Sequence, residues 1–237
     1  MLTDKQLKEE YFNMIGGFSQ LNIIHELNEY NGESQICIAC TQLKGEEEKT
    51  LFPDVKSYSQ SDKKRILKEW IDFLCTETKA IKKLHFNSKV PQSLFNAACC
   101  QEELEELRFK WGTYSDLSPI ENLKNLKFLY IGPGSSVSDI TSLGKMKNLI
   151  VLHMEGFKKI EDYSSLKSLE ALEQLVIWGP VLGFTPIKDL EFLREMPNLR
   201  SISIGNVRLK RKYTKEEIRK LYSDLPNLHF INNCIFS

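Results

Sequence analysis

The sequence lacks an excess of charge of either sign, because 32 lysines and arginines balance 32 aspartates and glutamates. A neutral chain has no general attraction to nucleic acid or to an anionic membrane, so we expect neither as a partner. It also lacks any apolar run near the ~18 residues of a membrane span. Its charged first ten residues contain no apolar core of a secretory signal. These absences predict a cytoplasmic protein.

Metal-binding patterns are also scarce. Cys37 and Cys40 form one C-x-x-C pair, but no second pair or suitably spaced histidine accompanies it, as a zinc site would require. Buried thiols are the favoured interpretation of all six cysteines, with a metal or redox role for this pair as the alternative. His85, His153 and His229 fall in separate segments, where solvated positions on a sheet are favoured. We predict no metal and no cofactor.

Signatures of catalysis are equally sparse. The glycine-rich residues 132–136 lack the lysine of a phosphate-binding loop and the G-x-G-x-x-G spacing, which favours a turn. The sequence has no G-x-S-x-G nucleophile motif. The basic residues 208–212 indicate a solvated loop, with contact to an acidic partner or a phosphate as the alternative. We therefore predict that the protein is not an enzyme.

What the sequence does contain is a repeat. Its pattern is L-x-x-L-x-L with conservative replacements, and partial copies lie at 81–86 and 228–231. The apolar residues alternate with polar ones, so each segment predicts a short strand with one buried face. No single unit can bury that face alone, so neighbouring units must stack into a sheet of six or seven strands. The full copies begin at Leu104, Leu126, Leu149, Leu172 and Leu199.

The period of the repeat is short. The fourth residues of the five copies are Leu107, Leu129, Leu152, Leu175 and Ile202, so successive units are 22, 23, 23 and 27 residues long. A unit of this length has room for only about one turn of α- or 3₁₀-helix in its connecting half.

The connecting halves repeat as well. Asp116, Asp139 and Asp162 each begin a similar stretch of serine, threonine and aliphatic residues. One carboxylate per unit could suggest metal binding, but turn and helix-cap hydrogen bonds explain the recurrence better.

These units resemble the short repeats of the bacterial internalins and the related phosphatase-regulatory leucine-rich-repeat protein, over residues 81–204. The resemblance implies an α/β leucine-rich-repeat solenoid, a right-handed coil with a curved parallel sheet whose exposed face binds other proteins. The family usually has an asparagine just after each strand. Here Gly112, Gly134, Phe157 and Gly179 or Pro180 take that place, so we expect the turns to close by other means.

The chain divides into three predicted parts: an N-terminal cap of helix, strand and helix over 1–80, the repeats over 81–207, and a C-terminal cap of helix and strand over 208–237. Capping boxes at Thr3 and Thr214 predict the first and last helices, the first of them running through Met14. A strand is predicted over 36–41, a long helix from Ser61, a short helix after Pro91 and a final strand over 228–231.

The outward positions of the predicted strands gather aromatic and aliphatic residues with charged neighbours. Large rigid aromatics in such a setting are typical of interface anchors, and an exposed apolar patch usually has a role. The alternatives are the ordinary preference of sheets for such residues, or a neighbouring segment that covers them. The candidate partner-binding residues are Arg108, Lys110, Phe128, Tyr130, Val151, His153, Glu155, Val176 and Trp178.

The predicted function is that of a noncatalytic protein–protein interaction scaffold, which binds a macromolecular partner on the exposed face of the sheet. Two alternatives stay open. The chain could be an immunity or effector component of a bacterial toxin or host-interaction system, or an enzyme whose site lies within residues 1–80.

Overall fold

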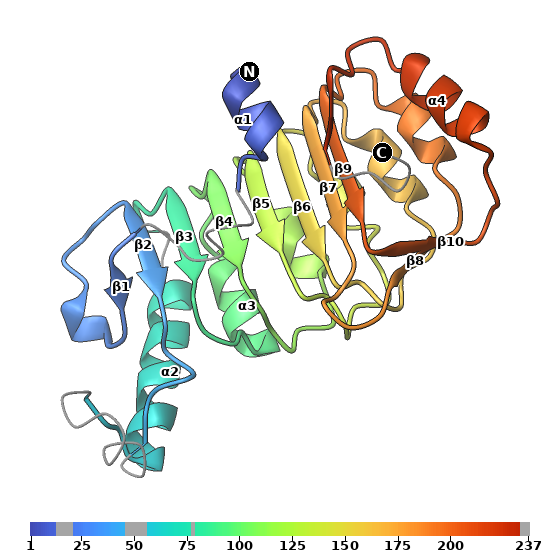
Figure 1. Cartoon of the computed structure of the whole chain (residues 1–237). Helices are drawn as coiled ribbons and strands as arrows, with labels where there is room; N and C mark the ends of the chain where they lie inside the picture. Colours follow the sequence, from blue (N-terminus) through green and yellow to red (C-terminus); the bar gives the residue numbers. More distant parts are fainter. Residues whose placement is uncertain (13–20, 46–55, 77–78, 233–237) are drawn as a thin grey trace.

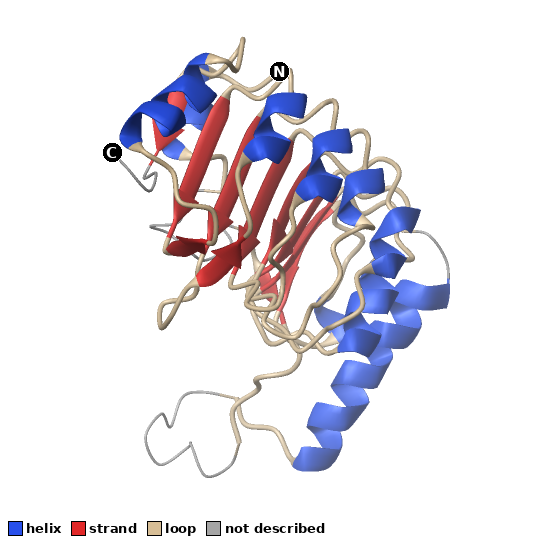
Figure 2. Ribbon diagram, turned by 90° about the vertical axis from the view of Figure 1, so that its right-hand side faces the viewer, coloured by secondary structure: helices blue, strands red, loops and turns tan. Residues whose placement is uncertain are grey.

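A computed structural model describes residues 1–12, 21–45, 56–76 and 79–232. Its main feature is a nine-stranded parallel sheet in the order β1-β2-β3-β4-β5-β6-β7-β9-β11. The strands follow one another along the sheet as the chain proceeds, and the helical segments that connect them form a row on one side of it, whereas the first helix lies on the other side (Figures 1 and 2). This architecture confirms the predicted α/β leucine-rich-repeat solenoid.

The sheet has more strands than the six or seven predicted, because residues 23–38 add two strands before the first repeat. The predicted strand at 36–41 therefore extends the repeat sheet. The strands are β1 (Ile23–Ile24), β2 (Gln35–Ile38), β3 (Lys83–Phe86), β4 (Glu106–Phe109), β5 (Phe128–Ile131), β6 (Val151–Glu155), β7 (Gln174–Trp178), β9 (Ser201–Gly205) and β11 (Phe230–Asn232).

The core lies between the sheet and the outer segments. Equivalent residues of successive units pair in register, so that Leu107 lies opposite Leu129 and Leu129 opposite Leu152. These leucines are fully buried, and each contributes roughly 1.5–3 kcal/mol of apolar burial. A fixed period thus places one leucine of every unit in the same continuous core.

The outer segments shorten where the repeat is regular. The first units carry α2 (Gln60–Thr76) and α3 (Gln92–Ala98), and α4 (Lys215–Ser223) follows the last. The 22- and 23-residue units carry 3₁₀ turns, as predicted. The 27-residue unit adds β8 (Thr185–Ile187), which pairs with β10 (Val207–Leu209). The 3₁₀ turns of the regular and 27-residue units are η3 (Ser118–Asn122), η4 (Leu143–Lys145), η5 (Ser164–Ser168) and η6 (Glu191–Glu195).

The recurring aspartates form the predicted turns. The Asp116, Asp139 and Asp162 carboxylates each accept a hydrogen bond of 2.8 Å from the backbone N–H two residues further on. Each of these turns precedes one of the 3₁₀ turns η3, η4 and η5, so the three carboxylates stabilise the fold of the repeat units.

An asparagine ladder is present, but before the strands. In four units the asparagine side chain donates a hydrogen bond of 2.7–3.1 Å to a backbone carbonyl of the preceding unit. Ala171 takes the equivalent place in a fifth unit. Sequence reasoning missed the ladder because it looked only after the strand, although the recurring Asn-Leu pair was visible. The asparagines are Asn125, Asn148, Asn198 and Asn227.

The first twelve residues lie away from the N-terminal end of the solenoid. Helix α1 (Asp4–Glu9) has the predicted capping box at Thr3 and stands in front of the sheet, apart from β1 (Figure 1). The helix ends at Glu9, since Glu10 has a φ of 61°, and Met14 falls outside the described residues. At the other end, Thr214 forms the predicted capping box of α4.

Candidate binding face

The side chains that point away from the outer segments form the inner face of the sheet. Strand register aligns them in rows, so that Tyr130 lies opposite Arg108 and His153, and Val176 opposite His153. The structure therefore brings the predicted partner-binding residues together on one face. They come from four consecutive strands, β4 to β7, and from Lys110 directly after β4.

Most of these residues are not exposed. Tyr130 is 6% exposed, Val151 0%, His153 1% and Val176 1%, and Arg108 is also buried. The expectation of an open patch is wrong, because the N-terminal arm (Met1–Phe12) lies on this face. The lower rim, composed of Lys110, Phe128, Glu155 and Trp178, stays half-buried.

Apolar side chains of the arm form a cluster with the face that is separate from the main core. Leu2, Leu7 and Phe12 are buried there against Tyr130 and Val151. The arm thus supplies the apolar cover that these two residues would otherwise lack. The alternative that a neighbouring segment covers the patch is the one that the structure shows.

Aromatic contacts position the end of the arm. The Tyr11 ring stacks on Phe128 with centroids 4.4 Å apart and planes 10° from parallel. The Tyr11 hydroxyl donates a hydrogen bond of 2.8 Å to Glu106. The Phe12 ring meets Tyr130 edge-on at 5.8 Å, and the Arg108 guanidinium lies 4.9 Å from the centre of the Tyr130 ring.

The face also binds the backbone of the arm. The last carbonyls of a helix have no partner within it, and here Leu7 O accepts hydrogen bonds from Gln174 (3.1 Å), Ser201 (2.8 Å) and Asn232 (3.0 Å). The Gln174 side-chain oxygen in turn accepts the N–H of Tyr11 at 2.7 Å. Three strands together thus satisfy the end of α1.

Charged residues hold the start of the arm. Glu173 accepts the N–H of Leu2 at 2.9 Å, and Arg200 donates to Leu2 O at 2.9 Å. Arg200 also pairs with Glu173 at 2.9 Å and with Asp4 at 3.3 Å. The arm is therefore fixed at both ends and in the middle.

Glu106 is the charged centre of the other end. Burial would raise the pKa of Glu106, but the hydrogen bond and charge of His85, 2.8 Å away, lower it below its ordinary value, with help from Tyr11 and Lys83. Burial followed by the charge of Glu106 raises the pKa of Tyr11. The pair is therefore an ionised carboxylate with a neutral phenol that donates to it.

His153 has an unusual environment. The prediction of solvated positions is wrong for both His85 and His153, which are buried, whereas His229 is exposed. Neither ring nitrogen of His153 has a hydrogen-bond partner among the described residues. Burial, then the charge of Arg108, lowers the pKa of His153 to about 3. His153 is therefore neutral on this face.

Glu10 is strained as well as buried. Its φ of 61° lies in the left-handed region, which residues with a Cβ rarely adopt. Burial raises the pKa of its carboxyl group, against the hydrogen bond with Ser203. One of its oxygens has no partner within the described chain.

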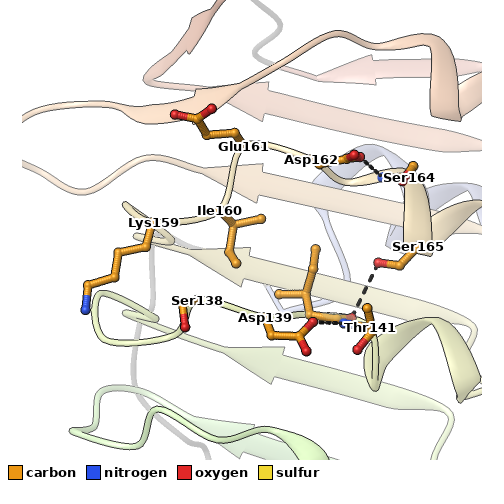
Figure 3. Close-up of a pocket in the computed structure, with 10 residues that line it drawn as sticks. Ser138, Asp139, Thr141, Lys159, Ile160, Glu161, Asp162, Ser164 and Ser165 are labelled. Atoms are coloured by element: carbon orange, nitrogen blue, oxygen red, sulfur yellow. Dashed lines mark hydrogen bonds between the residues drawn. The ribbon is translucent and has the colours of Figure 1, made fainter.

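An outer groove between two units is a weaker candidate. It is lined by residues 138–141, 159–162, 164 and 165, and Asp139 and Asp162 lie at its wall (Figure 3). Both carboxylates are occupied by the turn hydrogen bonds described above. Among the described residues, no group of three His, Cys, Asp or Glu side chains could hold a metal ion.

The cysteines divide into two classes. Cys37, Cys40 and Cys99 are buried, as predicted, and burial raises the pKa of Cys40 to about 12. The same prediction is wrong for Cys75 and Cys100, which are exposed, with Sγ atoms 3.9 Å apart. Cys234 lies outside the described residues.

The predicted loop over 208–212 is wrong for its first two residues, because Arg208 and Leu209 belong to β10 and pair with β8. The charged residues of this segment have local partners. Lys210 pairs with Glu161, Arg211 pairs with Glu191 at 2.7 Å, and Arg208 lies 5.1 Å from the centre of the Phe184 ring. Separately, no helix in the described part of the chain is long and apolar enough to cross a membrane.

No family model matches the sequence, and no curated protein matches it. Among solved structures, the fold is similar to internalin C2 of Listeria monocytogenes, at 21% identity and a TM-score of 0.51, over 68% of this chain and 64% of that chain. A second internalin of that species shows 16% identity and a TM-score of 0.43, over 78% of this chain and 66% of the other.

A leucine-rich-repeat protein of Leptospira interrogans shows 18% identity and a TM-score of 0.41, over 65% of this chain and 43% of that one. The chain thus spans less than two thirds of the length of each of these three structures. The likeness to internalin C2 concerns the fold, and it agrees with the period, the parallel sheet and the 3₁₀ turns. The chain has a leucine-rich-repeat fold whose units coil as in internalin C2.

Proposed function

We propose that the chain is a noncatalytic scaffold that binds a protein partner on the inner face of its sheet. The observation that carries this proposal is the arm itself. The face holds a peptide segment by its backbone, through Gln174, Ser201 and Asn232, and by its side chains, through Phe128 and Glu106.

The half-buried rim supports the same proposal. Trp178, Glu155 and Lys110 are half-buried on the same face, and Glu155 lies opposite Trp178 in the sheet. Aromatic residues beside charged ones are typical of the anchors of protein interfaces. A partner could therefore contact the rim and the face together.

Affinity capture from a lysate of the source organism tests the proposal. The face variant carries Trp178→Ala with Lys110→Ala. Tyr130 is left unchanged, because it is buried and bonds Glu155 at 2.5 Å, so that its loss would perturb the fold. The matched control carries Lys167→Ala with Glu195→Ala, an exposed ion pair of the outer segments. We expect one protein to be captured by wild type and control, and lost with the face variant. Equal capture by all three would contradict the proposal.

A further inference from the structure

The N-terminal arm contacts the inner face in the manner of a bound ligand. Its buried residues Leu2, Leu7 and Phe12 belong to the small cluster on the face and not to the main core. Its backbone is held by side chains of the sheet and not by strand pairing. The main core thus contains no residue of the arm, and α1 stands in front of the sheet (Figure 1).

The contact between arm and face has two defects. On the arm, Glu10 combines the left-handed φ with a buried carboxylate oxygen that has no partner among the residues that the structure describes. On the face, His153 lies 4.4 Å from the Tyr130 ring, between ring centres, and neither of its ring nitrogens is bonded within the described chain. Water could reach both groups if the arm left, so the closed state carries a cost that the open state does not.

We propose that the arm is a displaceable occupant of the inner face, and that the partner is a peptide segment of the same chemistry that takes its place. This inference rests on the proposed function, because it places the partner on the inner face. The arm is then a built-in competitor, which a partner must exceed in affinity.

The contacts specify the peptide. It has one or two helical turns that end near an aliphatic residue in the place of Leu7, whose carbonyl meets the three sheet donors. A tyrosine follows four residues later, stacks on Phe128 and donates its hydroxyl to Glu106. A second aromatic residue, in the place of Phe12, fills the cluster beside Tyr130.

Binding of a synthetic peptide to the full chain tests this directly. Leu7→Asp places a carboxylate in the apolar cluster and opens the arm, whereas Lys8→Asp adds the same group one position away, where the side chain is exposed. A fluorescent peptide of residues 1–12 is titrated against each protein and followed by anisotropy. We expect at least tenfold tighter binding to Leu7→Asp than to Lys8→Asp, because the attached arm competes at millimolar effective concentration. A peptide that itself carries Leu7→Asp should bind to neither.

The test has two controls. Circular dichroism checks that Leu7→Asp keeps its sheet. If Leu7→Asp does not fold, Leu2→Ala with Phe12→Ala opens the arm without a new charge. A folded, opened protein that fails to bind the peptide would overturn the inference. So would an opened variant that forms a dimer persisting on dilution and no longer binds the peptide, since a second copy would then fill the face.

The same variants separate this inference from the proposed function. We expect Leu7→Asp to capture more partner from lysate than Lys8→Asp does. Equal capture by these two, with loss in the face variant (Trp178→Ala with Lys110→Ala), would overturn the displaceable arm and leave the scaffold function standing. Peptide binding without capture by any variant would support the exchangeable arm and count against the scaffold.

Discussion

At the scale of single residues, the inner face carries polar groups that a purely structural surface would not need. His153 is fully surrounded and unbonded within the described chain, whereas Glu106 is satisfied by His85 and Tyr11. A buried polar group without a partner costs about 1–3 kcal/mol. His153 therefore lowers the stability of the protein at this position of the inner face.

Replacement of His153 by leucine should stabilise the protein. His153→Leu removes two buried nitrogens that have no partner in the described part of the chain, at similar volume, so we expect the free energy of unfolding to rise by about 1–3 kcal/mol at pH 7. His229→Leu, at an exposed position, serves as the control and should change it by less than about 0.5 kcal/mol. Urea unfolding measures both. Loss of stability in His153→Leu would show that the imidazole makes a favourable contact.

The same residue predicts a pH dependence. Its pKa is about 3 on the covered face and about 6.5 when free, so the covered state binds fewer protons. The contribution of His153 to the free energy of unfolding is therefore complete above pH 6.5. It falls by about 1.4 kcal/mol per pH unit as the pH drops from 6.5 toward 3. The raised pKa of Glu10 has the opposite effect on the pH dependence. Glu10 is present both in the wild type and in His153→Leu, so a comparison of the two cancels its contribution.

The comparison of wild type with His153→Leu isolates this effect. We expect the advantage of the variant in unfolding free energy to grow by at most about 2 kcal/mol between pH 7 and pH 5. Opening of the arm would limit the increase. An advantage that stays constant over this range would mean that His153 is accessible to solvent in the folded protein.

Thiol reactivity should follow exposure. Of the five cysteines that the structure describes, Cys75 and Cys100 are exposed and the other three are buried. We expect iodoacetamide to label these two in the native protein, while Cys37, Cys40 and Cys99 react only after unfolding. Peptide mapping by mass spectrometry reads the pattern. Native labelling of Cys99, the neighbour of Cys100, would show that the end of α3 is open.

At the scale of elements, the repeat made most of the coil predictable. Strands β3 to β7 and β9 fall where the L-x-x-L-x-L pattern places them, because stacking forces equivalent leucines into one core. β1 and β2 precede the repeat, and only β2 was predicted, without its place in the sheet. A two-residue strand such as β1 leaves no periodic signal in the sequence, and its pairing with β2 depends on the tertiary structure.

The asparagine ladder yields a prediction in both directions. Asn148→Ala removes the hydrogen bond to the Lys124 carbonyl, so we expect it to lower the free energy of unfolding by about 1 kcal/mol. Ala171→Asn supplies the absent rung and should raise it by a similar amount. Asn122→Ala, an exposed residue of η3, is the control. Thermal unfolding of the three variants decides, and unchanged stability in Asn148→Ala would mean that the ladder follows the coil without stabilising it.

At the scale of the whole molecule, the sequence predicted which residues share the inner face but not that the arm covers them. Tyr11 and Glu106 are 95 residues apart, and Leu7 and Asn232 are 225 apart. A six-residue helix with a capping box predicts its own start and not the surface on which it docks. The repeat pattern likewise predicts that the side chains of Tyr130 and Val176 point to the inner face, but it does not predict which segment covers them. The candidate site was therefore predictable as a set of residues, and its occupant was not.

The central claim is that the inner face is a peptide-binding surface that the arm fills reversibly. Native-state hydrogen exchange, followed at the amides of α1 and of β6 and β7, tests it most directly. We predict that the α1 amides are protected relative to a free peptide of residues 1–12, but open with a smaller free energy than the strand amides do. Protection equal to that of β6 and β7 would show that the arm leaves only when the whole protein unfolds, and α1 amides as fast as those of the free peptide would show that the face is uncovered.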